Sequence, residues 1–399
     1  MRTAMAVALA ISLLCVPTEA QDKPESMKIT LRSYGDSSQT ALEAFAAKLG
    51  YGVILPSEGD DVGGSIEDAC WFSIKDASVE QASAVLSRAF GLRVTVHHDR
   101  KKVSARSYMT TTRRVTRGYD VSLLCARYVD YVNRFNGAKP AKGFVERPAS
   151  SHLLDHMLGV MEATGLRGDS GSAVGQRLLF TLEEGEHAQI KELLNLLMNE
   201  KGGASVACVA QRQTLEALGK VTWDEEVTER PVASLLAALF AKAGRDFVIT
   251  YGMARELGEA HVTRAEAKGQ NGAALLADLT EAHQFGLGAV AGVALLGDMT
   301  TASWGSYRVF ELKPLLERLA QDYVNQRTKP RDGGFEGDIS NMGGLAVITS
   351  ALQEQGEGRE LTCTLKSFGT RLVALGSAQT LDELAAILKE MGFEEPKED

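Results

Sequence analysis

Two histidines of this chain have a spacing that could serve metal binding. His152 and His156 belong to the segment Ser-His-Leu-Leu-Asp-His-Met, so they share one face if that segment is helical. Zinc sites use imidazole pairs of this kind, but they need further ligands to complete a tetrahedral shell. The segment lacks the glutamate of a His-Glu-x-x-His motif, and no third ligand is evident nearby. We therefore expect no metal at this pair.

Ser170 has neighbours that could suggest a catalytic nucleophile. Residues 168–171 read Gly-Asp-Ser-Gly, the string found around the serine of trypsin-like proteases, and residues 167–169 form the adhesion tripeptide Arg-Gly-Asp. A serine protease also needs a histidine base and an acidic residue close to the serine. The upstream candidates, His152 and Asp155, lie on a predicted helix. We interpret the stretch as a turn before a strand, because glycine, aspartate and serine are common turn residues.

Three other polar clusters have structural interpretations. Residues 97–99 (His-His-Asp) fall at a predicted hairpin turn and form a solvated tip. Residues 183–187 (Glu-Glu-Gly-Glu-His) begin a predicted helix, where acidic side chains favour the positive end of the dipole. Residues 331–338 place three carboxylates in a glycine-rich loop, as calcium sites do, but their spacing matches no EF-hand. The sequence therefore predicts a protein without enzymatic activity, bound metal or cofactor.

The overall composition is that of an ordinary globular protein. The chain has 399 residues, of which 44% are hydrophobic and 24% charged, and its net charge is −9. This balance argues against a nucleic-acid partner, which would call for a basic patch. The length is enough for several domains.

The first residues have the pattern of a secretory signal peptide. Arg2 supplies a positive charge, residues 4–16 form an apolar run, and small residues precede a cleavage site after Ala20. The longest later apolar run, residues 285–297, is short and interrupted by glycines, so it predicts a pair of strands. We expect a periplasmic or secreted protein with no transmembrane segment after cleavage of residues 1–20.

The cysteines leave two interpretations open. Cys70, Cys125, Cys208 and Cys363 follow the signal peptide. An even number of cysteines in an oxidising compartment makes disulfides conceivable. The same small number is typical of buried free thiols.

The chain repeats itself after about 190 residues. Residues 130–144 and 322–335 both contain Asp-Tyr-Val-Asn, then Lys-Pro, then Gly-Phe. Further matches follow the same order in both copies: 45–54 with 240–249, 87–92 with 283–287, 119–121 with 307–309, and 175–180 with 369–374. This collinearity predicts a tandem duplication, with unit one at residues 27–212 and unit two at residues 220–395.

The repeated Asp-Tyr-Val-Asn segment has two interpretations. It could be a helix end that turns at Pro140 or Pro330 and whose aromatic residues pack inside the fold. Alternatively, it could form two equivalent surfaces that dock one partner. The candidate partner contacts are then Tyr131, Asn133, Tyr323 and Asn325.

Unit one begins with a regular succession of short elements. Alternating apolar residues predict a strand at 27–33, and capping residues bound predicted helices that end at Gly50 and Gly91. Short apolar runs between and after the helices predict strands at 52–55 and 70–76 and a hairpin at 92–107. The fold class is therefore α+β, in the order β-α-β-β-α-β-β, and a similar order begins at residues 220–225 in unit two.

This succession resembles the secretin/TonB short N-terminal domain, a periplasmic domain that precedes secretin channels and some TonB-dependent receptors. The matching phrases are residues 41–54 (ALEAFAAKLGYGVI) and 77–94 (ASVEQASAVLSRAFGLRV), followed by the hairpin. The resemblance implies modules of this type at residues 21–107 and 214–303.

The remainder of each unit resembles the strand-turn-helix of the next secretin periplasmic domain. The matching segments are residues 177–197 and 371–391, which implies second α+β modules at residues 108–213 and 304–395. The expectation is a tandem of such modules without the secretin pore domain or a receptor barrel.

The resemblance implies a non-enzymatic interaction or scaffold protein. Its partners would be cell-envelope or secretion-system proteins, or a second copy of the chain. A ligand-binding protein with a small molecule between the two units is one alternative. A secreted hydrolase with its site between the repeats is another.

Overall fold

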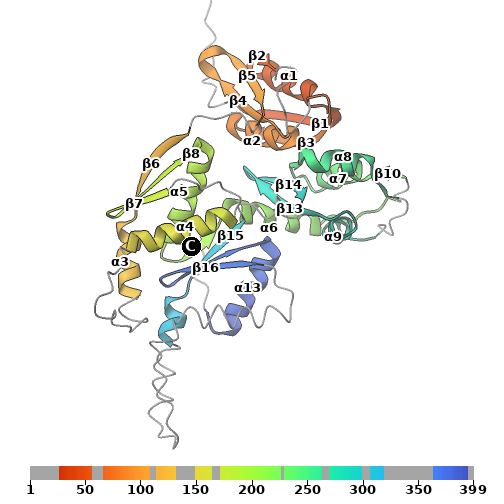
Figure 1. Ribbon diagram of the computed structural model, residues 1–399. Coiled ribbons are helices and arrows are strands. Elements are labelled where there is room, and N and C mark those ends of the chain that lie inside the picture. The colour runs from red at the N-terminus through yellow and green to blue at the C-terminus, as the bar shows by residue number, and fades with distance from the viewer. Residues whose placement is uncertain are drawn as a thin grey trace, which may run out of the picture.

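The computed structural model describes residues 27–55, 66–107, 114–131, 149–163, 171–225, 229–262, 269–298, 306–318 and 363–393. Helices and strands alternate along these residues, and the strands form several small sheets (Figure 1). The chain therefore belongs to the α+β class, as the sequence predicts.

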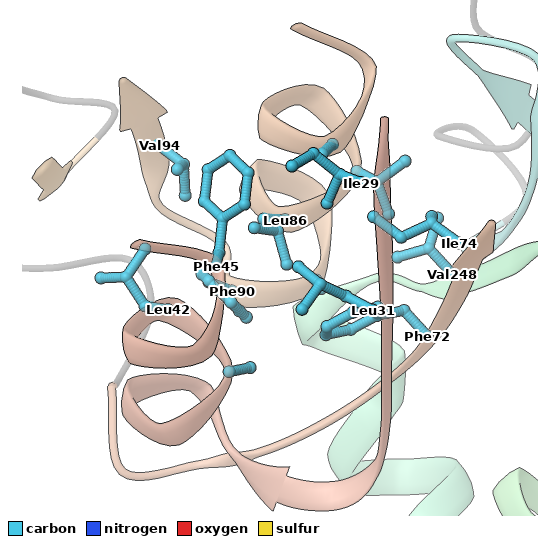
Figure 2. Packing of buried hydrophobic residues seen from close by; sticks show 14 of the residues in the cluster. Ile29, Leu31, Leu42, Phe45, Phe72, Ile74, Leu86, Phe90, Val94 and Val248 are labelled. Atoms are coloured by element: carbon cyan, nitrogen blue, oxygen red, sulfur yellow. The ribbon is translucent and has the colours of Figure 1, made fainter. Parts of the chain in front are cut away.

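Residues 29–106 form two sheets with two helices between them. β1 (Ile29–Ser37) pairs antiparallel with β3 (Ala69–Ala77). β5 (Lys102–Arg106) pairs parallel with β2 (Gly52–Ile54) and antiparallel with β4 (Arg93–His97). Helices α1 and α2 share one hydrophobic core with both sheets (Figure 2).

The ends of these two helices follow from capping residues that the sequence displays. α1 (Ser38–Leu49) begins after Ser37, whose side chain accepts a backbone hydrogen bond from the first turn, and ends at Gly50 in the left-handed conformation. α2 (Val79–Phe90) begins after the capping box of Ser78 and also ends at a glycine. The two predicted helices are therefore confirmed.

Both helices bury the faces that the sequence assigns to the core. These side chains lie between the two sheets and are almost inaccessible to solvent: Leu42, Phe45, Ala46, Leu49, Val79, Ala82, Val85, Leu86 and Phe90. Their spacing of three and four residues places them on one side of each helix.

The region from 206 to 298 alternates helices with short strands. The elements are α6 (Val206–Gly219), β10 (Arg230–Pro231), α7 (Val232–Lys242), β11 (Phe247–Ile249), α8 (Tyr251–Glu259), β12 (His261–Val262), α9 (Gly272–His283), β13 (Phe285–Val290) and β14 (Val293–Asp298). β10 pairs antiparallel with β12. β14 pairs antiparallel with β13 and parallel with β11, which confirms the strand pair predicted for residues 285–297. At residues 220–225 there is an isolated bridge from Thr222 to Asn271, so the first strand comes later than expected.

A strand of unit one joins a sheet of unit two. β3 pairs antiparallel with β11, with Phe72 opposite Val248 and Ser73 opposite Phe247. The result is a five-stranded sheet in the order β1-β3-β11-β14-β13. The two units therefore pack together through a continuous backbone ladder, which the sequence did not reveal.

Helices cover both faces of the unit-two part of this sheet. Val248, Val293 and Leu295 belong to the core around α1 and α2. Their neighbours along the strands belong to a second core with α7, α8 and α9: Phe247, Ile249, Ala294 and Leu296. A strand that is buried on both faces needs apolar residues at successive positions, which accounts for the continuous apolar run of β14.

In β5, apolar side chains alternate with polar ones. Val103 and Ala105 belong to the core around α1 and α2, and Lys102, Ser104 and Arg106 are on the opposite face of the strand. Lys102 and Arg106 are exposed, whereas Ser104 is buried and its hydroxyl lies 3.0 Å from Nε2 of His97. The polar face of β5 is therefore only partly in contact with solvent.

The rest of unit one forms a second group of elements. These are β6 (Val115–Asp120), α3 (Ser122–Tyr131), α4 (Ala149–Ala163), β7 (Gly171–Val174), β8 (Arg177–Leu182) and α5 (Glu184–Met198). β8 lies in the middle of a three-stranded antiparallel sheet with β6 and β7. Arg177 is its first residue, in agreement with the strand entry that the repeated Gly-x-Arg-Leu phrase predicts.

The last elements form a four-stranded sheet that again combines both units. They are β9 (Gly202–Ala204), β15 (Tyr307–Glu311), β16 (Thr364–Phe368), β17 (Arg371–Leu375) and α13 (Ala378–Glu390). β17 pairs with β15 and β16, and β15 also pairs with β9 of unit one. One face of this sheet packs against α4 and α5, and the other packs against α13.

The described cysteines are free thiols that lie in the cores or at their edges. Cys70, Cys125 and Cys208 are buried, and Cys363 is half-buried. Burial raises the pKa of the Cys70 thiol to about 11. The structure therefore favours the interpretation of these residues as packed thiols over disulfides.

None of the described helices combines the length and the apolar character that crossing a bilayer requires. The predicted signal peptide, residues 1–20, lies outside the described residues.

Candidate functional site

An open groove lies where three helices converge on the end of a strand. Its walls come from α6, α9 and α13, and its base includes the start of β13. The groove encloses about 1260 Å³. Its lining residues are Gln211, Arg212, Leu215, Glu216, Ala273, Leu276, Ala277, Thr280, Glu281, Phe285, Gly286, Leu287, Gly376, Ser377, Ala378, Gln379, Thr380, Asp382, Glu383 and Ala386.

A buried glutamine fixes the walls of this groove relative to one another. The Gln211 side-chain amide on α6 donates to the backbone carbonyl of Leu287 in β13. Its Oε1 atom accepts hydrogen bonds from the backbone N–H of Ala378, at 2.7 Å, and from the Ser306 hydroxyl, at 3.3 Å. One side chain therefore ties α6 to the strand and to the first residue of α13, so the groove is built into the fold.

An ion pair crosses one end of the groove. Arg212 on α6 binds the carboxylate of Asp382 on α13 through Nε, at 3.1 Å, and through Nη2. Arg308 on β15 approaches the same carboxylate at 3.4 Å. The hydrogen bond to Asp382 raises the pKa of Arg212. Arg212 and Arg308, the two arginines near this end of the groove, therefore share the carboxylate of Asp382 as their counter-ion.

The remaining charged groups of the lining are carboxylates. Glu216, Glu281 and Glu383 are all exposed, and each stands on a different helix. The lining thus contains four carboxylates and one guanidinium, which gives the groove a negative rim.

A second feature that could bind a partner is the outer edge of β2. The backbone N–H of Gly52 donates to the carbonyl of Lys101 at 3.0 Å, so the hydrogen-bonding groups of Gly52 face β5. Because these groups alternate along a strand, those of Val53 face the opposite edge. Within the described residues, β2 pairs with β5 and with no other strand.

Of the four candidate partner contacts, one falls within the described residues. Tyr131, at the end of α3, is 9% exposed and packs in a core with Leu372 and Cys208. A partner could therefore reach little of this side chain without a rearrangement. Asn133, Tyr323 and Asn325 lie outside the described residues, so their proposed role stays a prediction.

The histidine pair lies on α4, as predicted, but the two rings contact aromatic residues. His152 lies 5.4 Å from the ring of Tyr128, and His156 lies 5.8 Å from the ring of Phe368. Among the described residues, no group of three or more His, Cys, Asp or Glu side chains is arranged to hold a metal ion.

His187, at the end of the acidic cluster 183–187, is a satisfied core residue. Its Nε2 atom donates to the carbonyl of Val115 at 2.7 Å, so the hydroxyl of Tyr119 donates to Nδ1, also at 2.7 Å. Glu183 caps α5, which confirms that this cluster begins a helix.

The other polar clusters fall partly within the described residues. Residues 98–100 form an exposed helical turn between β4 and β5, which confirms the solvated tip for His98 and Asp99. His97 differs from the prediction, because it is the half-buried last residue of β4 and its Nε2 atom lies 3.0 Å from Oγ of Ser104. Ser170 and the acidic loop 331–338 lie outside the described residues.

Sequence reasoning missed the groove, although its helices carried a signal. Ala273 and Ala277 are spaced by four residues on α9, and Ala386 is exposed on α13. A surface helix normally carries long polar side chains at such positions. Alanines there indicate a face that another helix or protein can approach closely. The signal was weak because alanine is also the strongest helix former.

Comparisons with protein-family models, with curated proteins and with solved structures give no significant match to this chain.

Proposed function

We propose that the chain is a non-enzymatic protein-interaction or scaffold protein of the periplasm or the extracellular space. In this proposal it is built from duplicated modules that resemble the secretin/TonB short N-terminal domain. Each of these modules is followed by a second small α+β module.

The pairing of the strands supports the duplication in the first module of each unit. In unit one, β1 pairs antiparallel with β3, and β5 pairs parallel with β2 and antiparallel with β4. In unit two, β10 pairs antiparallel with β12, and β14 pairs parallel with β11 and antiparallel with β13. The two sets have the same directions and the same order along the chain. In unit two, helix α8 follows β11, and the stretch that follows β2 in unit one, residues 56–65, lies outside the described residues.

The second modules support the duplication in the same way. β8 lies between β6 and β7, and β17 lies between β15 and β16, all antiparallel. The hairpins that lead into β8 and β17 turn at Gly175 and Gly369, and both glycines have a φ of +59°. These are the glycines of the repeated Gly-x-Arg-Leu phrase, so one turn geometry explains why both copies keep them.

The observation that best supports this function is the addition of a strand to the edge of β11, because β2 has an edge equivalent to it. β11 accepts β3 on the side away from β14. By the pairing above, β2 is the counterpart of β11 in unit one, and its outer edge is the counterpart of the edge that β3 occupies. An extended segment of a partner protein could pair there, because backbone hydrogen bonds supply affinity in this mode of binding.

The proposal names classes of partner and does not identify one protein. Cell-envelope or secretion-system proteins with an extended segment fit the resemblance, and a second copy of the chain is the other candidate. The alternative of a ligand-binding protein or hydrolase with a site between the repeats has less support. The groove lies among α6, α9 and α13 instead, and its described lining includes neither histidine nor cysteine.

Capture from intact cells with one backbone change tests this function. The chain, tagged after its last residue, is crosslinked in cells as wild type, Val53→Pro and Val53→Thr. Proline removes the outward N–H of β2, whereas threonine keeps that N–H and the branched shape. We expect the same partner in the wild type and Val53→Thr, and its loss in Val53→Pro at unchanged secondary structure. Equal capture by Val53→Pro would contradict strand addition at β2.

A further inference from the structure

The groove among α6, α9 and α13 has the size for a helix. It is open to solvent and encloses about 1260 Å³. A helix with its side chains is about 10–12 Å across, so a groove of this volume accommodates about two to three turns. Typical small-molecule sites are smaller, roughly 300–1,000 Å³, and enclose most of the ligand.

The walls of the groove would allow the backbone of a bound helix to approach them closely. Ala273 and Ala277 on α9 and Ala386 on α13 present only methyl groups to the groove. Leu215 and Leu287 are half-buried and offer apolar surface between these methyls. Small residues of this kind reduce the distance at which two helices pack, and the leucines supply the apolar contact area.

The charge on the rim selects the partner. Glu216, Glu281 and Glu383 are exposed, one on each of the three helices. Arg212 cannot balance them fully, because its guanidinium binds Asp382. An apolar base between acidic rims is complementary to an apolar helix face between basic flanks.

We propose that this groove binds an amphipathic helix of a partner protein, with alanine or leucine on its apolar face and lysine or arginine on both flanks. The inference deepens the proposed interaction function by naming a second surface and its partner class. A second copy of the chain is a poorer occupant, because each copy has a net charge of −9.

Peptide binding to the full mature chain tests the proposal. The probe is a fluorescein-labelled helical peptide of about 14 residues with an Ala/Leu face and lysine flanks. Fluorescence anisotropy is measured for the wild type, for Ala277→Arg, which fills and recharges the groove, and for Ala282→Arg. Ala282 is an exposed residue of the same helix outside the groove lining, so it is the matched control.

We expect Ala277→Arg to weaken binding at least tenfold and Ala282→Arg to leave it nearly unchanged. Changing Glu216, Glu281 and Glu383 together to glutamine should weaken binding about tenfold at low salt, since exposed ion pairs each contribute modestly. A scrambled peptide of the same composition, without an apolar face, should bind much more weakly.

Three results of the peptide measurement would overturn the proposal, and a dye measurement adds a fourth. They are no binding of the lysine-flanked peptide, equal binding by Ala277→Arg, and equal binding of the scrambled peptide. If a neutral apolar dye binds in the groove and the peptide does not displace it, the groove belongs to a small ligand. Val53→Pro should not affect peptide binding, so failure at the β2 edge and failure at the groove are distinguishable.

Discussion

Phe72 of β3 lies directly opposite Val248 of β11, and this pair joins the two units of the chain. Both side chains belong to the core around α1 and α2, where Phe72 also packs edge-on against Phe90 with ring centres 6.4 Å apart (Figure 2). One residue pair thus connects a backbone ladder between units with the hydrophobic core of unit one.

Truncating the Phe72 side chain should destabilise both units. Phe72→Ala leaves a cavity at a position that is 1% exposed, and we expect a loss of about 3–5 kcal/mol in the free energy of unfolding. Urea unfolding measures this loss. Hydrogen exchange should also show faster exchange of the β11 amides, because the ladder across the junction weakens.

Leu123→Ala is the control for this prediction. Leu123 lies on α3, outside the ladder between β3 and β11, and is 48% exposed, so its truncation should cost far less. If the two variants lose similar stability, the junction is not a principal source of the stability of the chain.

The second connection between the units depends on a glycine. Gly202 of β9 has a φ of +75°, and a Cβ atom built there would lie 2.1 Å from the backbone oxygen of Val309 on β15. Neither the left-handed conformation nor the close approach suits a larger residue. Gly202→Ala should therefore separate β9 from β15 and cost at least about 2 kcal/mol of stability, measured by urea unfolding.

Gly219 provides the control on the next helix. It is the last residue of α6, and a Cβ atom there would meet nothing within 4 Å. Gly219→Ala should be nearly neutral or slightly stabilising. If Gly202→Ala and Gly219→Ala lose the same stability, the close contact between β9 and β15 is not the cause of the loss.

A buried histidine should make stability depend on pH. The Nε2 atom of His156 on α4 is buried, and none of the described residues forms a hydrogen bond with it. Burial, together with the nearby Lys366 on β16, lowers the pKa of His156 from 6.5 to about 4. The folded state therefore binds this proton more weakly than the unfolded state does.

The weaker proton binding of His156 in the folded state sets the direction in which stability changes with pH. Stability from neutral His156 is complete above about pH 6.5 and is lost as the pH falls to about 4, by up to about 3 kcal/mol. His156→Leu removes this titration. The free energy of unfolding of the wild type relative to the variant should therefore decrease over this range, as urea unfolding at several pH values can show.

The comparison of the wild type with His156→Leu also defines the contradicting result. Parallel curves for the wild type and His156→Leu would show that His156 titrates alike in both states.

Much of the local structure could be predicted from the sequence, because local forces determine it. Ser78 and Gly91 bound α2, and apolar residues at helical spacing identify its buried side. The turn at Ala291 and Gly292, both with positive φ, divides residues 285–297 into two strands. Such signals come from residues a few positions apart, so an isolated stretch already contains them.

The sheet partners could not be predicted in this way. β11 is three residues long, and nothing in Phe247–Ile249 identifies β3, far away in the sequence, as its neighbour. Any strand edge offers the same backbone donors and acceptors, so the choice depends on which hydrophobic surfaces must be covered together. The groove also escaped prediction, because its three walls come from helices that meet only in the folded chain.

The sequence by itself therefore determined the α+β class, the ends of the main helices and the alternation or continuity of apolar residues along the strands. Only the tertiary structure decided that the helices of unit one cover a sheet of unit two, and that β3 and β9 extend the sheets of unit two. The physical reason is that caps and turns are satisfied within a few residues. Burial of a sheet face, by contrast, is satisfied by whichever distant surface fits it best.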